Sequence, residues 1–553
     1  MRINILIAGE AGQGIDKLSD LICKIIASRG LYVFNYKDYQ SLITGGINFN
    51  VINISNQKNF CYDKKYDFAI FLDKKLINLF LKDIKYKAII IGEKGIKDEI
   101  KSKRYKFIEV DVDNLIKKYN LKKIVKNTIF LGIIAKIFGF DKDCFKIVQD
   151  NFETLIKDNT LAFEIGYNYE NKIKFKLPKY KRNIFYFKGN EAIAKAFEET
   201  IDIYFAYPMT PSTSLLHNLA KDKIFTFQLE SEIAVINAAL GASFAGKRVA
   251  VGTSGGGFAL MNEALSLAGM AELPIVIYVA MRYGPSTGAP TYSSQGDLKY
   301  IINAGHGEFA KVVLSLDGNN IFQQVINAVY LAYTYRIPVI LIGDKIIAES
   351  GYSFNEAEIK KFINNAKKIR ERLEKQNKKL KKNNKLIKNY PFNNPFFILP
   401  KLGEHIFKVT SYEHDEYGFN KDDVETIKKM GKRRKERIER INKIIKNGYS
   451  IYGNKNSKNL LIAYGSVANS LIEFSKNKNF KVIAINCLKP FPDISKEIKK
   501  AKKVFVFEDS LTCQLADLIK ENCCIEIKNK ITNHTGRIWL VEDIENMLKW
   551  KKI

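Results

Sequence analysis

Cysteine is scarce in this chain and shows no spacing typical of a metal site. Seven cysteines occur among 553 residues, and no two of them form a Cys-x-x-Cys pair. The sequence therefore encodes neither an ordinary zinc site nor a typical iron–sulfur cluster. We expect the adjacent Cys523 and Cys524 to be buried, unreactive thiols.

Long apolar runs are also missing. None reaches the ~18 residues that a helix needs to cross a bilayer. The segment Met1–Gly9 pairs a charge with a short apolar run, as a secretory signal does. We interpret it as a β-strand instead, because the glycine-containing turn Gly9–Gly14 follows at once and no cleavage site does. The sequence predicts a cytoplasmic protein that does not contact a membrane.

Acidic residues are in deficit. There are 59 Asp and Glu against 89 Lys and Arg, a formal charge of +30. Such an excess can indicate nucleic-acid binding. Here lysine is abundant throughout, and the densest basic runs, Lys360–Lys388 and Lys428–Lys446, carry apolar residues at helical spacing. We expect solvated helix faces and no nucleic-acid partner, although a basic surface also suits acidic proteins.

The chain is too long for one hydrophobic core and alternates apolar strand segments with amphipathic helices. This pattern predicts an α/β protein with several doubly wound parallel-sheet domains. We expect a first domain over residues 1–175, a second over 185–350, a charged helical connector over 351–457 and a last domain over 458–553. The turn Gly9–Gly14 has only a weak likeness to a dinucleotide fingerprint, because Ala11 replaces the middle glycine.

Four unusual loops follow one another within the second predicted domain. They are Tyr207–Thr213, Gln228–Glu232, Thr253–Gly257 and Arg282–Thr291, and three of them come directly after short apolar runs. Ligands of α/β sheets collect at the carboxyl ends of strands, where Gly, Pro, Ser and Thr let backbone donors approach closely. We expect the chemistry of the protein here.

Glu232 opens an apolar helix, Glu232–Ala245, that is rich in alanine and glycine. One interpretation is an acidic residue stabilised by the helix dipole; another is a catalytic carboxylate. Glu230 is the rival position, but Glu232 is better in phase with the small residues. His306 and Glu308 are further acid–base candidates, for which a structural hydrogen-bonding role is the alternative.

Together these loops resemble the α subunit of the 2-oxoacid:ferredoxin oxidoreductases, with a γ domain fused in front. Residues 1–175 resemble that γ domain, residues 185–350 the pyrimidine-binding domain of thiamine diphosphate enzymes, and residues 458–553 a transketolase C-terminal-like domain. The resemblance implies roles for individual residues. Catalytic roles fall on Glu232, Thr210 and Arg282; substrate binding on Tyr207, Pro208, Thr210, Ser212, Thr213 and Arg282; cofactor binding on Glu232, Thr253, Ser254, Gly255 and Gly256.

A further absence predicts a partner. Thiamine enzymes usually hold magnesium on a Gly-Asp-Gly segment, whereas this chain has Gly343-Asp344-Lys345. The resemblance therefore implies a β subunit that supplies diphosphate binding, Mg²⁺ and the iron–sulfur cluster, in a heterodimer or a dimer of heterodimers. It also implies ferredoxin as electron acceptor and coenzyme A as co-substrate. Thr44, where the γ domain usually has arginine, and Ala11 leave coenzyme A binding by residues 1–175 open.

The implied reaction is oxidative decarboxylation of a 2-oxoacid, with 2-oxoglutarate or pyruvate as the expected substrate, to acyl-CoA and CO2. Alternatives are a branched-chain or indolepyruvate enzyme with the same chemistry, or a basic, non-catalytic binding or scaffold protein. Cys513, which stands where the family has glycine, affects packing in this interpretation and not catalysis.

Overall fold

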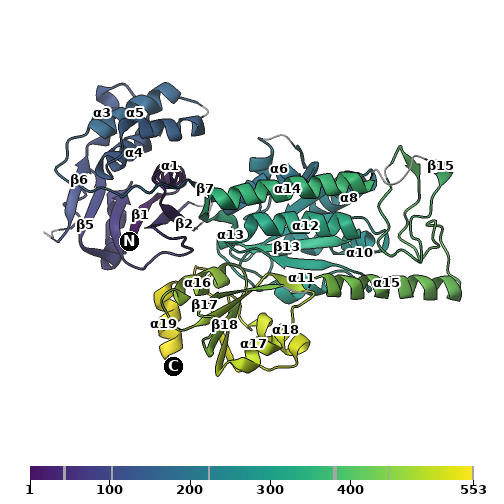
Figure 1. Ribbon diagram of the computed structural model, residues 1–553. Coiled ribbons are helices and arrows are strands. Elements are labelled where there is room, and N and C mark those ends of the chain that lie inside the picture. Colours follow the sequence, from purple (N-terminus) through teal and green to yellow (C-terminus); the bar gives the residue numbers. More distant parts are fainter. Residues whose placement is uncertain are drawn as a thin grey trace. The chain divides into compact units, whose positions relative to one another are not determined.

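The computed structural model describes residues 1–40, 45–100, 104–152, 154–221, 224–377, 383–400, 402–445 and 448–550. The chain forms two compact units, shown in Figure 1. The first comprises Met1–Lys188, Glu349–Ile359 and Leu540–Ile553, and the second comprises Gly189–Ala348 and Lys360–Trp539. Among the described helices, none has the length and apolar character of a membrane span.

An eight-stranded sheet forms the centre of the first unit, in the order β6-β5-β4-β1-β3-β2-β14-β7. Strands β1, β4, β5 and β6 are parallel, as the alternating sequence predicts, whereas β3 runs antiparallel to both β1 and β2. The sheet is therefore mixed. Its strands are β1 (Arg2–Glu10), β2 (Tyr32–Tyr39), β3 (Ile47–Ser55), β4 (Tyr66–Phe71), β5 (Ile84–Glu93), β6 (Lys106–Val110), β7 (Ile184–Lys188) and β14 (Gly351–Asn355).

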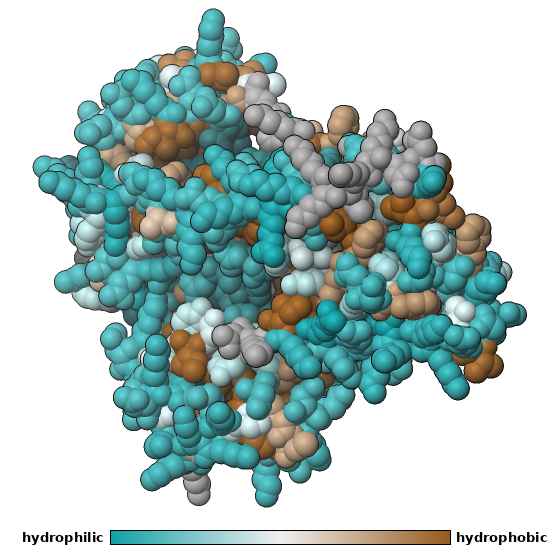
Figure 2. All heavy atoms as spheres, turned by 45° about the vertical axis from the view of Figure 1, so that its right-hand side comes forward, coloured by the Kyte–Doolittle hydropathy of each residue, from teal (hydrophilic) through white to brown (hydrophobic). Residues whose placement is uncertain are grey.

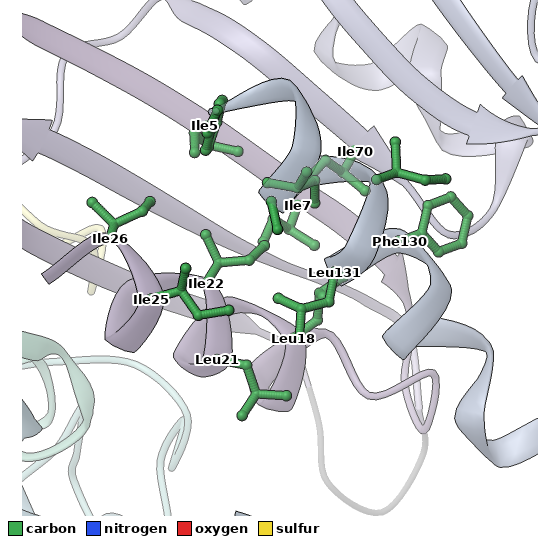
Figure 3. Close-up of a cluster of buried hydrophobic side chains, with 14 of the residues drawn as sticks. Ile5, Ile7, Leu18, Leu21, Ile22, Ile25, Ile26, Ile70, Phe130 and Leu131 are labelled. Atoms are coloured by element: carbon green, nitrogen blue, oxygen red, sulfur yellow. The ribbon is translucent and has the colours of Figure 1, made fainter. Parts of the chain in front are cut away.

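Helix α1 (Ile15–Ala27) packs on this sheet through one apolar face. Figure 3 shows Leu18 and Ile22 of this helix on the side that faces Ile7 of β1. Burial of such side chains contributes roughly 1.5–3 kcal/mol each. The other α-helices of the unit are α2 (Ile77–Phe80), α3 (Val112–Lys118), α4 (Lys126–Ile137), α5 (Ile156–Asn168) and α19 (Val541–Trp550).

The turn before α1 ends in two residues with left-handed backbone, Gly12 at φ 85° and Gly14 at φ 75°. Glycine adopts this conformation without steric cost, which explains the glycines without requiring a bound nucleotide. The amide of Ala11 donates to the carbonyl of Gly46. Thr44 lies outside the described residues.

The larger sheet of the second unit has seven strands in the order β20-β12-β13-β11-β10-β8-β9. All neighbours are parallel except β20, which is antiparallel to β12. The predicted strands near 203, 249 and 275 are present. The strands are β8 (Ile203–Ala206), β9 (Phe225–Gln228), β10 (Val249–Thr253), β11 (Ile275–Met281), β12 (Val312–Ser315), β13 (Pro338–Asp344) and β20 (Cys487–Lys489).

Helices cover both faces of this sheet. Helix α6 contacts both α7 and α12, and α8 contacts α9 and α10; Figure 1 shows α12 along β13. The helices are α6 (Gly189–Thr200), α7 (Thr213–Leu219), α8 (Glu232–Phe244), α9 (Gly255–Leu260), α10 (Asn262–Met270), α11 (Leu298–Asn303), α12 (Ile321–Tyr335) and α13 (Lys345–Glu349).

The connector contains two long helices, α14 (Glu356–Asn377) and α15 (Val424–Ile444), and the short strand pair β15 (Asn383–Leu386) and β16 (His405–Ile406). The predicted basic helices therefore exist, although residues 378–382 and 446 lie outside the described residues. The expectation that these basic runs form solvated helix faces is wrong for Arg433 and Arg437 of α15, which are buried.

A five-stranded sheet, β17-β19-β18-β21-β22, completes the second unit and is parallel except for β17. Its strands are β17 (Tyr449–Gly453), β18 (Asn459–Ala463), β19 (Lys481–Ile485), β21 (Lys503–Glu508) and β22 (Asn529–Thr532), with helices α16 (Gly465–Ser475), α17 (Ser495–Lys500) and α18 (Gln514–Cys523). Cys523 is buried as expected, but Cys524 is exposed because the chain leaves α18 there at φ 56°.

The surface reflects the composition. The face in Figure 2 is mainly hydrophilic, with hydrophobic residues in separate groups. Such scattered apolar residues are normal on a folded protein and do not by themselves mark an interface.

Candidate functional site

The predicted loops lie together at the carboxyl ends of the parallel strands of the seven-stranded sheet. Strands β8, β9, β10 and β11 are parallel and in register, with Ala206 opposite Gln228 and Gly252 opposite Ala206. The segments after these strands therefore emerge together at their carboxyl ends. Tertiary structure thus brings together the four loops that are dispersed over residues 207–291 of the sequence.

Asn190, at the start of α6, anchors the Tyr207–Thr213 loop. The Asn190 side chain donates to the carbonyl of Pro211 at 2.9 Å and to Ser214 Oγ at 2.7 Å, and its oxygen accepts from the Tyr278 hydroxyl at 3.0 Å. Asn190 is fully buried, so these bonds fix the loop to the sheet. No local pattern in the sequence indicates this role.

Arg282 follows β11 and reaches that loop. Its Nη1 donates to the carbonyl of Thr210 at 2.7 Å. Partial burial lowers the pKa of Arg282, and the nearby Asp297 carboxylate counteracts this. An arginine remains charged under such a shift, so the site presents a partly desolvated cation beside Thr210. A cation of this kind is suited to a carboxylate ligand.

Glu232 stands at the first position of α8, where Ser231 caps the helix by accepting the Ala234 amide at 3.2 Å. The Glu232 side chain is only 4% exposed, and its Oε1 is buried without a hydrogen-bond partner among the described residues. Glu230, the rival position, is exposed. A buried carboxylate oxygen without a partner is costly and suits an atom that a ligand will satisfy.

The glycines after β10 leave room beside this carboxylate. A Cβ on Gly257 would lie 2.6 Å from Glu232 Oε1 and 2.2 Å from Thr253 Oγ1. Ser254 Oγ is likewise buried without a partner among the described residues. Gly256 has open space beside it. The turn therefore carries an orphaned hydroxyl and accessible backbone, and its Gly257 lies against the orphaned carboxylate of Glu232.

Comparison with known proteins identifies the family. Residues 195–433 match the family described as pyruvate flavodoxin/ferredoxin oxidoreductase, thiamine diphosphate-binding, and residues 4–169 match the pyruvate ferredoxin/flavodoxin oxidoreductase family. The 2-oxoacid:ferredoxin oxidoreductase subunit alpha of Sulfolobus sp. is 29% identical over 99% of this chain and 96% of its own length. The 2-oxoglutarate synthase subunit KorA of Methanocaldococcus jannaschii is 31% identical, over 59% of this chain and 88% of its own length. The chain belongs to the 2-oxoacid:ferredoxin oxidoreductase α-subunit family.

The fold agrees with this family. The solved 2-oxoglutarate:ferredoxin oxidoreductase from Magnetococcus marinus matches with a TM-score of 0.83 and 24% identity, covering 100% of this chain and 99% of that chain. The predicted α/β fold of the oxidoreductase α subunits is thereby confirmed, as is the thiamine diphosphate-binding domain in the segment that carries the four loops.

The two further acid–base candidates, His306 and Glu308, lie away from the carboxyl ends of the parallel strands. His306 and Glu308 are exposed and precede β12, so they stand at the amino ends of the parallel strands. The His306 amide donates to Ser266 Oγ at 2.8 Å. This position favours a structural contribution over acid–base catalysis at the carboxyl edge.

The remaining predicted substrate-binding residues belong to the Tyr207–Thr213 loop itself. Ser212 is buried and its hydroxyl donates to the carbonyl of Met209 at 2.8 Å, so it stabilises the loop conformation. Tyr207 is 38% exposed. Pro208 is partly buried, and Thr213 begins α7. Of this loop, Thr210 is the residue directly bonded to Arg282.

A cavity of about 270 Å³ adjoins Arg282 and extends toward the five-stranded sheet of the same unit. Its lining includes Asp297, Asp509, Gln514 and His534. The segments after β21 and β22 thus meet the segment after β11 at one cavity. The sequence pattern did not single out the lining residues Asp509, Gln514 and His534.

Proposed function

We propose that this chain is the subunit that binds the pyrimidine end of thiamine diphosphate in a CoA-acylating 2-oxoacid:ferredoxin oxidoreductase. The reaction converts a 2-oxoacid, coenzyme A and oxidised ferredoxin into acyl-CoA, CO2 and reduced ferredoxin. 2-Oxoglutarate and pyruvate are the proposed substrates. The observation that carries the proposal is the buried, unpartnered Glu232 carboxylate beside Gly257.

The residues after β9 and β10 fit the cofactor. Glu232 offers a carboxylate that would share a proton with a ring nitrogen, Ser254 offers a hydroxyl, and Gly255 and Gly256 expose backbone. When bound, thiamine diphosphate supplies the carbanion chemistry that removes CO2 from a 2-oxoacid. The part of Glu232 is to hold a proton at its carboxylate and so favour one tautomer of the pyrimidine. Burial strengthens this interaction by excluding water.

Arg282 and Thr210 would hold the substrate. The Arg282 guanidinium uses Nη1 for the Thr210 carbonyl, which fixes its plane. Its other N–H groups are available to a carboxylate, and a planar fork binds carboxylates better than an ammonium group does. The Thr210 hydroxyl lies in the same loop. Every 2-oxoacid carries the carboxylate that this pair would recognise, whatever its side chain.

We propose a β subunit as the obligatory partner, with Mg²⁺, the iron–sulfur cluster and the ferredoxin site on it. Apolar residues are exposed on neighbouring elements around Glu232: Phe225 (71%), Phe227 (45%), Ile233 (53%) and Leu260 (53%). Strand β9, which carries the two phenylalanines, is an edge strand. A partner that covers this surface would bury it and close the site over Glu232.

We also propose a cytoplasmic location for the protein. The division of the chain into four domains, over residues 1–175, 185–350, 351–457 and 458–553, likewise stays a proposal.

The test is co-production of the chain with its β subunit, followed by reduction of methyl viologen over a panel of 2-oxoacids. We expect thiamine-dependent, CoA-dependent turnover with at least one of 2-oxoglutarate, pyruvate, a branched-chain 2-oxoacid or indolepyruvate. The preferred substrate distinguishes among the family's activities. A purified, cofactor-loaded complex that turns over none of them would refute the proposed function.

A further inference from the structure

Asp297 lies between the two halves of the candidate site. Its Oδ2 occupies the space over Gly255, where a Cβ would stand 2.1 Å from it. It also lines the cavity beside Arg282. Asp297 therefore connects the turn that follows β10 with the arginine that follows β11.

The Asp297 carboxylate is not used by its own helix. Asp297 is the N-cap residue of α11, a position where an aspartate side chain usually accepts a backbone amide. Here it makes no such capping bond, and no hydrogen bond to this carboxylate arises from the described residues. The carboxylate thus forgoes the helix cap and faces the cavity that Arg282 also lines.

Asp297 and Arg282 interact electrostatically without sharing a hydrogen bond. Burial raises the pKa of Asp297 and the Arg282 charge lowers it; burial lowers the pKa of Arg282 and the Asp297 charge raises it. The hydrogen bond of Arg282 goes to the Thr210 carbonyl. Arg282 therefore bonds the Thr210 carbonyl and lines the same cavity as the Asp297 carboxylate, with N–H groups left for a ligand.

The loop that carries Asp297 is fixed through Gln295, which is fully buried. The Gln295 amide donates to the Asp509 carbonyl at 2.6 Å, and its side-chain oxygen accepts the Asp509 amide at 3.0 Å. Its side-chain nitrogen donates to the Tyr464 carbonyl at 3.0 Å. The Tyr464 hydroxyl in turn donates to the Gln295 carbonyl at 3.2 Å. Asp509 and Tyr464 follow strands of the five-stranded sheet.

Gln514 holds the other side of the same loop. Its side-chain nitrogen donates to the Gly296 carbonyl at 2.6 Å, and its oxygen accepts the Lys299 amide at 2.7 Å. These bonds bracket Asp297 in the sequence. The position of the Asp297 carboxylate is therefore set by the domain that contains the five-stranded sheet.

We propose that Asp297 is a positioning residue for Arg282, and that the C-terminal sheet acts on the substrate site by fixing the Gln295–Asp297 turn. Asp297 acts through its charge on the guanidinium, across the cavity that both side chains line, and so favours the position of Arg282 that receives the 2-oxoacid carboxylate. The inference rests on the proposed function and assigns a role in substrate binding to the five-stranded sheet, whose following segments also line the cavity.

The test uses the complex with the β subunit and a double-mutant cycle. Asp297→Ala and the isosteric Asp297→Asn are each made with native Arg282 and with Arg282→Met. Asp493→Asn, a change at an exposed aspartate outside the cavity lining, is the matched control. For each variant we would measure kcat and KM for the preferred 2-oxoacid, together with the melting temperature.

With native Arg282, we expect Asp297→Ala to raise KM about 10-fold with little change in kcat, since lost substrate positioning is a loss of uniform binding. Asp297→Asn should raise KM less. In the Arg282→Met background, Asp297→Ala should change KM less than about 2-fold, because residues that act through one another are not additive. Gln514→Ala should shift KM in the same direction and lose its effect in that background.

Equal effects of Asp297→Ala in both backgrounds, or no effect with native Arg282, would overturn the positioning role. If Asp297→Ala fails to fold, the cycle built on the isosteric Asp297→Asn decides between the same two outcomes. Failure of the proposed function is distinct, because the parent complex and Asp493→Asn would then both lack 2-oxoacid turnover. In that case the inference fails with it.

Discussion

Two glutamates separated by one residue differ sharply in their surroundings. Glu230 is exposed, whereas Glu232 is 4% exposed and lies against the Gly257 backbone with one carboxylate oxygen unsatisfied. The difference arises because β9 ends at Gln228 and α8 begins at Glu232, which turns the latter side chain inward. The surroundings of the two side chains therefore support Glu232 over Glu230.

Glu232→Gln should leave the α–β complex assembled and lower its kcat about 10²- to 10⁴-fold, because an amide cannot hold the proton that favours the active tautomer. Size-exclusion chromatography checks assembly, and steady-state methyl viologen reduction measures kcat. Glu230→Gln is the matched control and should remain near the parent rate. A severe loss in Glu230→Gln with a mild one in Glu232→Gln would reverse the assignment.

Arg282→Met should lower kcat/KM by about 10- to 100-fold for every accepted 2-oxoacid. The reason is the loss of a charge-assisted hydrogen bond worth ~1.5–3 kcal/mol to the carboxylate that all of them share. The measurement is kcat/KM over the substrate panel. A loss confined to 2-oxoglutarate would instead place Arg282 at the distal carboxylate.

Among the helices, α15 is attached to the segment between α10 and β11 by a buried cluster of charges. Glu272, between α10 and β11, accepts hydrogen bonds from Arg433 and Arg437, and Arg437 Nη1 lies 3.0 Å from Glu272 Oε2. Arg437 also donates to the carbonyl of Arg336 at 2.7 Å. These guanidinium groups hold the Glu272 pKa at about 2, against the opposing effect of burial.

This cluster predicts a pH-dependent stability. Because the Glu272 pKa is about 2 in the folded chain and 4.5 in the reference state, its stabilisation is complete above about pH 4.5 and is lost as pH falls toward 2. The shift corresponds to roughly 3 kcal/mol. Glu272→Gln should lower Tm at pH 7, and the difference in Tm from the parent should narrow below pH ~4.5.

Thermal unfolding from pH 7 to pH 3 would measure this effect. Glu439→Gln, on the exposed side of the same helix, is the control and should shift Tm little at any pH. A Tm difference for Glu272→Gln that stayed constant down to pH 3 would contradict the assigned pKa shift.

For the chain as a whole, the proposed function implies a pyrimidine-binding half-site that a partner completes with a diphosphate site. The segment Gly343-Asp344-Lys345 places Asp344 in the interior, where it accepts the amides of Ile347 and Ser466 and has its pKa raised by burial. Asp344 is thus committed to internal bonds. Within the described residues, no group of three or more metal-binding side chains is arranged to hold an ion.

The isolated chain should therefore be inactive and bind thiamine diphosphate with Mg²⁺ at least about 100-fold more weakly than the α–β complex, because the diphosphate contributes most charged contacts. Isothermal titration of both preparations measures the difference. Glu232→Gln in the complex gives the loss due to the pyrimidine end alone. Equal affinity of isolated chain and complex would contradict the half-site.

Sequence alone determined the α/β class, the strands around residues 203, 249 and 275, the start of α8 at Glu232 and the family. These features depend on local periodicity and on the chemistry of loop residues, which the chain carries wherever it folds. The tertiary structure decided the rest: antiparallel β3 within the first sheet, the exposure of Cys524, buried Arg433 and Arg437 around Glu272, and the Gln295 contacts that place Asp297. Strand pairing and charge compensation join residues tens to hundreds of positions apart, so no local pattern specifies them.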